Sequence, residues 1–221
     1  VAIRDAVLVA YLGQGFQPAL EDALEGRGGP SLDLLEGQEL IAGSASDPEG
    51  GAGGAGVDPH VWLDPVRFAR MGRSLAKALG DPSSADDLVA RLDELDAELH
   101  DGLETCERRE IVTSHAAFGY LADRYDLTQI ALTGLSPDSQ PSPKEIESLV
   151  EAVRAEGATT VFFETLVSSD LAETVAREAG ASTAVLDPLE GLTAEQVDDG
   201  ADYFSVMREN LAVLRKALGC T

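Results

Sequence analysis

Two of the three histidines in this 221-residue chain stand where a ligand-binding side chain is expected. His60 lies in the segment DPHVWLDP, between two Asp-Pro pairs, and His115 closes the segment REIVTSH. Asp187 follows the apolar run STAVL. Neutral imidazole nitrogens and carboxylate oxygens are donors that bind zinc or manganese. Taken singly, each of these residues is more often a helix cap or a turn residue, so only a shared position would indicate a metal site.

Two further residues belong among the candidates. Glu164 follows the apolar run TTVFF, where a carboxylate could support a site or act as a general base. His100 stands between charged residues in the middle of an expected helix. A histidine on such a solvated helix face is interpreted as non-functional, so the sequence favours His60 and His115 over His100.

The elements that must position these residues follow one pattern from residue 109 onward. Strand-like segments alternate with helical ones, which predicts an α/β fold with a parallel sheet covered by helices. The expected strands are 109–115, 128–134, 159–165 and 182–189, and the expected helices are 116–126, 142–157, 169–180 and 193–219. Ligands bind outside the carboxyl ends of such strands, which is where His115, Glu164 and Asp187 stand.

The first part of the chain is shorter and less regular. Residues 5–13 indicate a strand, 18–26 a short helix and 31–41 a mixed or strand-like segment. Residues 42–59 are rich in glycine and are expected to form an exposed flexible loop. The length of 221 residues allows either one large domain or two small lobes, and both remain open at this point.

Helices are expected to follow the glycine-rich segment. Asp64 and Pro65 suit the N-cap and the first turn of a helix over 64–80. Leucines then recur at helical spacing, at Leu88, Leu92, Leu95 and Leu99. This spacing predicts an amphipathic helix over 84–105, with a length of about 30 Å.

Composition narrows the class of function. The 16 basic and 40 acidic residues give a net charge of −24, which opposes binding to the phosphate backbone of nucleic acids. No apolar run reaches the length of about 18 residues that a membrane span needs. The chain opens with VAIRDAVLVAYLG, which is typical of the interior of a fold, so we expect further residues upstream.

The two cysteines lie too far apart for a zinc ribbon or a thioredoxin-like redox site. Cys106 and Cys220 form no CxxC pair. Two free buried thiols and a single disulfide in an oxidising compartment both remain open at this point.

Five segments, taken in order, resemble a known family. They are DPHVWLDP, VTSHAAFGYLADRYDL, LSPDSQPSPKEI, TTVFFETLVSSDLAETVAREAG and AVLDPLEGL. Together they are similar to the metal-binding solute receptors of ABC importers, the ZnuA/TroA-like zinc and manganese binding proteins. The resemblance covers nearly all of the chain.

The resemblance implies a fold of two lobes with parallel sheets, joined by a long rigid helix. We expect an incomplete N-terminal lobe at 1–63, linking helices that include the spine at 64–105, and a C-terminal α/β lobe at 106–221. Trp62 is expected to pack at the lobe junction.

The resemblance also implies a ligand set. His60 and His115 match metal ligands and Asp187 matches the carboxylate that completes the site, whereas Glu164 is expected to support it. The first ligand of the family is expected upstream of residue 1. A histidine at position 115, where manganese receptors tend to have Glu, favours zinc over manganese.

The implied function is an extracytoplasmic zinc receptor, without enzymatic activity, that delivers metal to the permease of an ABC importer. It is expected to be a monomer that is periplasmic or lipid-anchored and binds no nucleic acid. Many zinc receptors carry a His-rich loop before the second ligand, but here that place holds SASDPEGGAGGAGV, so we do not expect a metal-gathering role for it.

Four alternatives remain open. They are a manganese receptor, a surface adhesin on the same scaffold with a structural metal, a zinc hydrolase with Glu164 as general base, and an α/β domain without metal. The hydrolase is disfavoured because the sequence contains no HExxH or similar signature.

Export would place both thiols in an oxidising compartment. Cys106 lies where the expected C-terminal lobe begins and Cys220 at the end of its last helix. The points at which a chain enters and leaves a domain often lie close together. We therefore predict a disulfide between Cys106 and Cys220.

Overall fold

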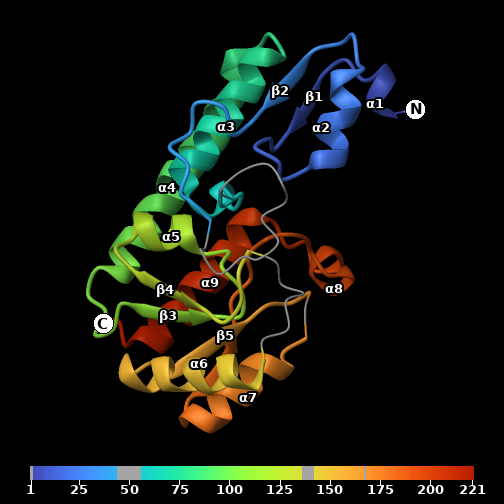
Figure 1. Ribbon diagram of the computed structural model, residues 1–221. Helices are drawn as coiled ribbons and strands as arrows, with labels where there is room; N and C mark the ends of the chain where they lie inside the picture. Colours follow the sequence, from blue (N-terminus) through green and yellow to red (C-terminus); the bar gives the residue numbers. More distant parts are fainter. Residues whose placement is uncertain (1, 44–55, 136–141, 167) are drawn as a thin grey trace.

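The computed structural model describes residues 2–43, 56–135, 142–166 and 168–221 (Figure 1). Within these ranges the chain forms two parallel sheets, which lie toward opposite ends of the molecule. The expected two-lobed α/β fold is confirmed. Most of the glycine-rich segment expected to be a flexible loop lies outside the described residues.

The smaller sheet has two strands, β1 (Val9–Tyr11) and β2 (Ser31–Asp33), which pair in parallel with Val9 opposite Ser31. Two helices accompany it, α1 (Ala2–Asp5) and α2 (Pro18–Glu25). The expected strand over 5–13 and helix over 18–26 are confirmed, and the mixed segment 31–41 contains only the short strand β2.

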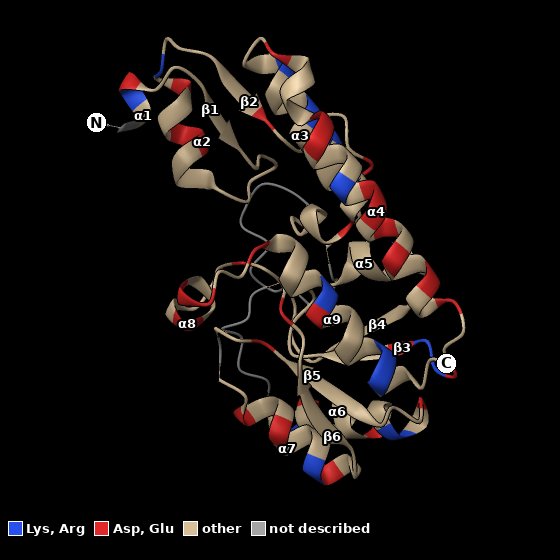
Figure 2. Cartoon of the chain, turned by 180° about the vertical axis from the view of Figure 1, so that it is seen from behind, with Lys and Arg blue, Asp and Glu red and all other residues tan. Residues whose placement is uncertain are grey.

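Two long helices run side by side from the smaller sheet toward the larger one (Figure 1). They are α3 (Pro65–Ala78) and α4 (Asp86–Leu103), joined by the short 3-10 helix η2 (Pro82–Ala85). The α4 residues Leu92, Leu95 and Leu99 are fully buried, as their spacing predicts. Figure 2 shows Asp and Glu recurring along α4, whose other face packs against the core.

The larger sheet has the strand order β4-β3-β5-β6, and all its neighbours are parallel. Its strands are β3 (Glu110–Thr113), β4 (Thr128–Ala131), β5 (Thr160–Phe163) and β6 (Ser182–Val185). Alternate side chains point to opposite faces of a strand, so Ile111 and Val112 enter different cores.

Helices cover both faces of this sheet. The core that contains Ile111 also contains residues of α4, α5 (Gly119–Arg124) and α9 (Tyr203–Leu218). The core that contains Val112 is closed by α6 (Pro143–Ala155) and α7 (Asp170–Ala179). Among the described helices, none is both long and apolar enough to cross a membrane.

The prediction of one continuous helix over 193–219 is wrong. The chain instead forms α8 (Ala194–Asp198) and α9, with a break between them. Gly200 has a φ of 75°, which turns the backbone out of the helix, and the Asp202 carboxylate then accepts from Ser205 N as a new N-cap. A capping residue after a left-handed glycine therefore outweighs the helical pattern.

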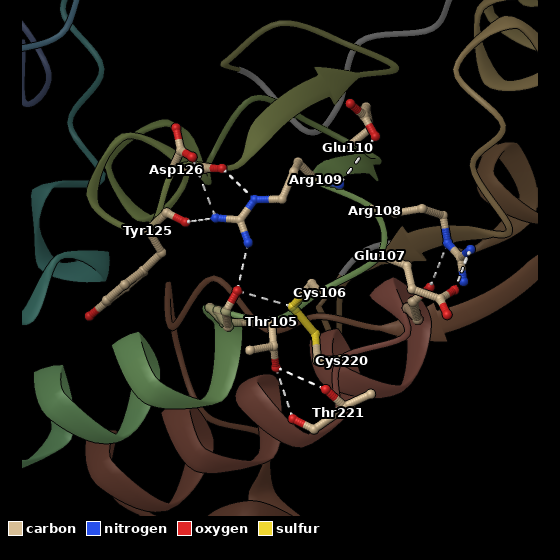
Figure 3. Close-up of a disulfide and its surroundings, with 12 residues drawn as sticks. Thr105, Cys106, Glu107, Arg108, Arg109, Glu110, Tyr125, Asp126, Cys220 and Thr221 are labelled. Atoms are coloured by element: carbon tan, nitrogen blue, oxygen red, sulfur yellow. Dashed lines mark hydrogen bonds and ion pairs between the residues drawn. A yellow bond between two sulfur atoms is a disulfide. The ribbon is translucent and has the colours of Figure 1, made fainter.

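The predicted disulfide between Cys106 and Cys220 is confirmed (Figure 3). The two Cα atoms are 3.8 Å apart and the bond spans a sequence separation of 114 residues. Beside it, Thr105 Oγ1 donates to the Thr221 carbonyl at 2.9 Å. The Arg109 guanidinium, also drawn in Figure 3, donates to the carbonyls of Leu103, Tyr125 and Asp126. The end of α4 and the end of α9 are thus joined at one point.

Candidate metal centre

His60 is held by the turn that precedes α3. It is 1% exposed and immediately precedes the 3-10 helix η1 (Val61–Leu63). The Asp58 carboxylate accepts hydrogen bonds from His60 N at 2.9 Å and from His60 Nδ1 at 2.7 Å. The Asp64 carboxylate caps α3 by accepting from Val66 N at 2.8 Å. Asp58 and Asp64 thus fix the backbone on both sides of His60, and the ring is left with only Nε2 for a ligand.

His115 follows β3 and is completely buried. Its Nδ1 donates to Glu164 Oε1 at 2.5 Å, and the Ser114 hydroxyl donates to the same carboxylate. Strand β5, which precedes Glu164, pairs directly with β3, so the two strand ends bring these side chains together. This contact agrees with the expectation that Glu164 supports the site.

The two imidazoles meet a third side chain, Glu190. Its Oε1 lies 2.9 Å from His60 Nε2 and 3.2 Å from His115 Nε2. One potential ligand atom from each of the three residues lies within 4.8 Å of the others. Among the described residues, no other group of His, Cys, Asp or Glu side chains is arranged in this way. Glu190 has 31% of its side chain exposed, whereas both histidines are buried.

Asp187 is buried but its carboxylate points elsewhere. Its Oδ1 accepts from Leu189 N at 2.8 Å, and its Oδ2 accepts from Thr165 Oγ1 at 3.2 Å and from Gln196 Nε2 at 3.0 Å. The structure therefore brings His60 and His115 together with Glu190 and leaves Asp187 outside the group of potential ligands.

The sequence reasoning missed Glu190, although the residue stands in the segment AVLDPLEGL that carried part of the resemblance. Asp187 is closer to the end of β6 and was the better candidate by strand position. The available signal was a second carboxylate three residues later in the same loop. Choosing between them requires the path of that loop.

Trp62 lies beside the candidate site, whereas His100 lies on a solvated helix face, as expected. Trp62 Nε1 donates to the Pro188 carbonyl at 2.8 Å, so the indole links the His60 segment to the loop that carries Glu190. His100 lies on the exposed face of α4, with 66% of its side chain accessible, and does not belong to the group.

The electrostatics of the group favour charge on all three members. Burial lowers the pKa of His115, but hydrogen bonds to Glu164 and Glu190 outweigh it and raise the pKa to about 9. Burial also lowers the pKa of His60, but hydrogen bonds to Asp58 and Glu190 outweigh burial and raise this pKa above its ordinary value. Hydrogen bonds from His115 and His60 lower the pKa of Glu190 to about 2.

This arrangement suits a divalent cation. Each histidine donates a hydrogen bond from Nδ1 to a buried carboxylate. This contact fixes the orientation of the ring and increases the basicity of Nε2. Each Nε2 atom lies within hydrogen-bond distance of Glu190 Oε1. The separations between Glu190 Oε1 and the two nitrogens are close to the edge of a tetrahedral zinc site, about 3.3 Å for bonds of 2.0–2.1 Å.

Comparisons with known proteins agree with this chemistry. The chain is 35% identical to the zinc-binding protein AdcA of Streptococcus pyogenes serotype M6 over an alignment of 240 positions. This alignment covers 96% of this chain and 46% of AdcA. The chain therefore spans about half the length of this relative. It is 32% identical to the high-affinity zinc uptake system protein ZnuA of Bacillus subtilis, over 98% of this chain and 73% of that protein.

The fold has solved relatives as well. The crystal structure of the Zn(II)-bound ZnuA-like domain of Streptococcus pneumoniae AdcA matches with a TM-score of 0.78 and 33% identity, over 98% of this chain and 81% of that one. Residues 1–217 match the family model described as ZnuA, zinc-uptake complex component A, periplasmic. With its two-lobed fold and its His-His-Glu group, the chain belongs to the ZnuA family.

Proposed function

We propose that this protein is a zinc receptor that binds the ion through His60, His115 and Glu190. The observation that carries the proposal is the meeting of both Nε2 atoms with Glu190 Oε1, at 2.9 and 3.2 Å. Each Nδ1 is held by a buried carboxylate, which is the usual support for a histidine that binds zinc. The zinc-binding and zinc-uptake functions of AdcA and ZnuA support the same assignment.

The donor set favours zinc over manganese. Two imidazoles and one carboxylate are suitable for a borderline cation, whereas manganese prefers sites richer in oxygen. Three protein donors leave one tetrahedral position for a further ligand. X-ray absorption spectroscopy of the zinc-loaded protein would count the nitrogen and oxygen donors directly.

A role in transport is favoured over hydrolysis. An open metal position would suit an enzyme only with a nearby general base. Glu164, the candidate base, is 3% exposed and its Oε1 already accepts from His115 and Ser114. We therefore propose that the protein carries zinc without catalysing a reaction.

The proposed partner is the permease of an ABC importer, and the proposed location is outside the cytoplasm. The Cys106–Cys220 disulfide supports an oxidising compartment. We propose a monomeric receptor with the lobe limits expected from the sequence, 1–63 and 106–221, joined by 64–105. The net charge of −24 disfavours nucleic acid as a partner.

Metal analysis and calorimetry test the proposal. Protein purified without chelators should contain about one zinc per chain, and His115→Ala should weaken zinc binding at least tenfold because one donor is lost. His100→Ala is the matched control, since it removes an exposed imidazole from α4. Equal zinc affinity in the two variants would contradict the proposed site. Unchanged growth of a deletion strain under zinc limitation would favour the adhesin alternative.

A further inference from the structure

The loop that carries Glu190 is fixed by side chains that do not themselves face the metal group. Asp187, at the start of the loop, is 4% exposed, and Asn210 on α9 is 3% exposed. Buried polar side chains are almost always hydrogen-bonded to specific partners in native structures. Their partners all belong to the loop or to its immediate supports.

Asn210 holds both backbone groups of Asp187. Its Oδ1 accepts from Asp187 N at 2.9 Å, and its Nδ2 donates to the Asp187 carbonyl at 2.7 Å. Strand β6 ends at Val185, so the side-chain amide takes the place of a neighbouring strand just beyond the sheet. The loop therefore leaves the sheet at a position set by α9.

The Asp187 carboxylate then determines the direction of the loop. It accepts from Leu189 N at 2.8 Å, which closes a turn between residues 187 and 189. Leu189 has a φ of 57°, a left-handed conformation that residues other than glycine rarely adopt. Backbone in this conformation persists only where its surroundings hold it. Gln196 and Thr165 fix the other carboxylate oxygen of Asp187.

Glu190 follows directly after this turn. Its carboxylate meets both histidines although its side chain is 31% exposed and the histidines are buried. Glu190 is thus the member of the group nearest to solvent, and its placement depends on the preceding turn. We propose that Asp187 and Asn210 are positioning residues for Glu190, and that they control zinc affinity by holding the loop 187–190.

This inference rests on the proposed zinc-binding function and deepens it. It assigns Asp187 a role different from that of a ligand. A carboxylate that binds zinc can be replaced by an amide only with a large loss of affinity. A carboxylate that closes a turn can be replaced in part by Asn, because the amide oxygen still accepts from Leu189 N, although the amide nitrogen cannot accept from Gln196 Nε2.

The experiment measures zinc affinity of the full chain by competition with a chromophoric chelator, together with thermal unfolding of the metal-free protein. Asp187→Ala should raise the zinc Kd about tenfold to a hundredfold, as loss of a supporting group does. Asp187→Asn should recover part of that loss, because it keeps the acceptor for Leu189 N and loses the acceptor for Gln196 Nε2. Asp198→Ala, an exposed residue of α8, is the control for removal of one negative charge.

A double-mutant cycle separates positioning from direct binding. In a Glu190→Gln background, Asp187→Ala should change the Kd less than twofold, because the residue that it positions is already impaired. Thr165→Val removes one hydrogen bond to the Asp187 carboxylate and should cause a smaller loss of zinc affinity. This variant replaces Asp187→Ala in the experiment if Asp187→Ala does not fold.

Three results would overturn the inference. One is wild-type affinity in both Asp187→Ala and Thr165→Val. Another is an Asp187→Asn variant as weak as Asp187→Ala while Glu190→Gln binds normally, which would make Asp187 the ligand. The third is a full effect of Asp187→Ala in the Glu190→Gln background. Absence of zinc binding by the wild-type chain would instead refute the proposed function, and the inference with it.

Discussion

At the scale of single residues, the site consists of two layers with different tasks. His60, His115 and Glu190 face one another with the atoms that could bind an ion. Asp58 and Glu164 hold the opposite ring nitrogens at 2.7 and 2.5 Å. Because the rings cannot rotate without breaking these buried contacts, the donor atoms are arranged before any ion arrives.

Glu164→Gln tests the supporting layer. The amide oxygen can still accept from His115 Nδ1, but the negative charge that raises the basicity of the ring is lost. We expect the zinc Kd to rise about tenfold to a hundredfold. Calorimetry of wild type and variant at the same pH gives the measurement. Exposed Glu178→Gln on α7 is a suitable control, and equal Kd values in Glu164→Gln and wild type would refute a supporting role.

The pH dependence of zinc binding follows from the raised pKa values of His115 and His60. In the metal-free chain the pKa of His115 is about 9, so zinc must displace a proton from this ring at neutral pH. Glu190, with a pKa of about 2, stays ionised across this range. The zinc Kd should therefore rise by up to about tenfold for each unit by which pH falls below 9, and more steeply where His60 is protonated as well.

Titrations between pH 6 and 9, in buffers with different heats of ionisation, would count the released protons. The stability of the chain without zinc has the opposite pH dependence, because the contribution of His115 to it falls as pH rises. The pKa of His115 is raised above the ordinary value of 6.5, so its contribution to stability is present below 6.5 and is lost as pH rises through about 9. A zinc Kd that is constant over this range would contradict the protonated resting state.

At the scale of secondary-structure elements, the ends of helices and strands position the residues of the candidate site. His115 and Glu164 follow the paired strands β3 and β5, and His60 precedes the capped start of α3. Helix α9 contacts two of the segments that carry the candidate ligands. The Tyr203 hydroxyl donates to the Trp62 carbonyl at 2.6 Å, and Asn210 holds Asp187. The position of one helix thus relates His60 to Glu190.

The cap of α3 provides an element-scale prediction. Asp64→Ala removes the acceptor for Val66 N and Arg67 N, and we expect a loss of about 1–2 kcal/mol in the free energy of unfolding. Because the same turn holds His60, zinc affinity should also fall. Denaturant unfolding and chelator competition measure the two effects.

Ser142→Ala is the matched control for a cap away from the site. Ser142 caps α6 by accepting from Glu145 N, and its removal should cost a similar amount of stability. Zinc affinity should stay unchanged because α6 packs on the opposite face of the sheet from α9. Identical effects of the two substitutions on zinc affinity would argue against a role of the α3 cap in placing His60.

At the scale of the whole molecule, α4 connects the region of the small sheet to the large sheet, and the disulfide closes the far end (Figures 1 and 3). The bond joins the residues after α4 to those after α9 across 114 positions of sequence. The helix pair α4 and α9 is also linked by the Glu98–Arg208 ion pair, although its exposed position limits its contribution to stability.

Removing the disulfide should destabilise the protein without weakening zinc binding. The double variant Cys106→Ala, Cys220→Ala should lose up to about 4–5 kcal/mol of unfolding free energy, because the unfolded chain is no longer restricted by a long loop. The real loss is expected to be smaller, since α9 remains docked through Phe204, Met207 and Leu214. Denaturant unfolding measures stability, and a large rise in zinc Kd would contradict the separation of bond and site.

The sequence by itself predicted the class of fold and the disulfide pairing, and it selected His60 and His115 among the candidates that meet in the structure. The fold class follows from strand and helix periodicity and from capping residues, whereas the choice of the two histidines and the disulfide pairing also rested on the resemblance to a family of exported receptors. A pattern of this kind records the backbone direction at each residue, which is why His60 and His115 could be placed.

Only the tertiary structure decided between Asp187 and Glu190. The two carboxylates stand three residues apart in one loop, and strand position favours the first of them. The left-handed turn at Leu189, and the hold of Asn210 on Asp187, direct the second toward the histidines. These determinants come from α9, which lies 23 residues further along the chain at Asn210, and no local pattern can encode a contact between segments that meet only after folding.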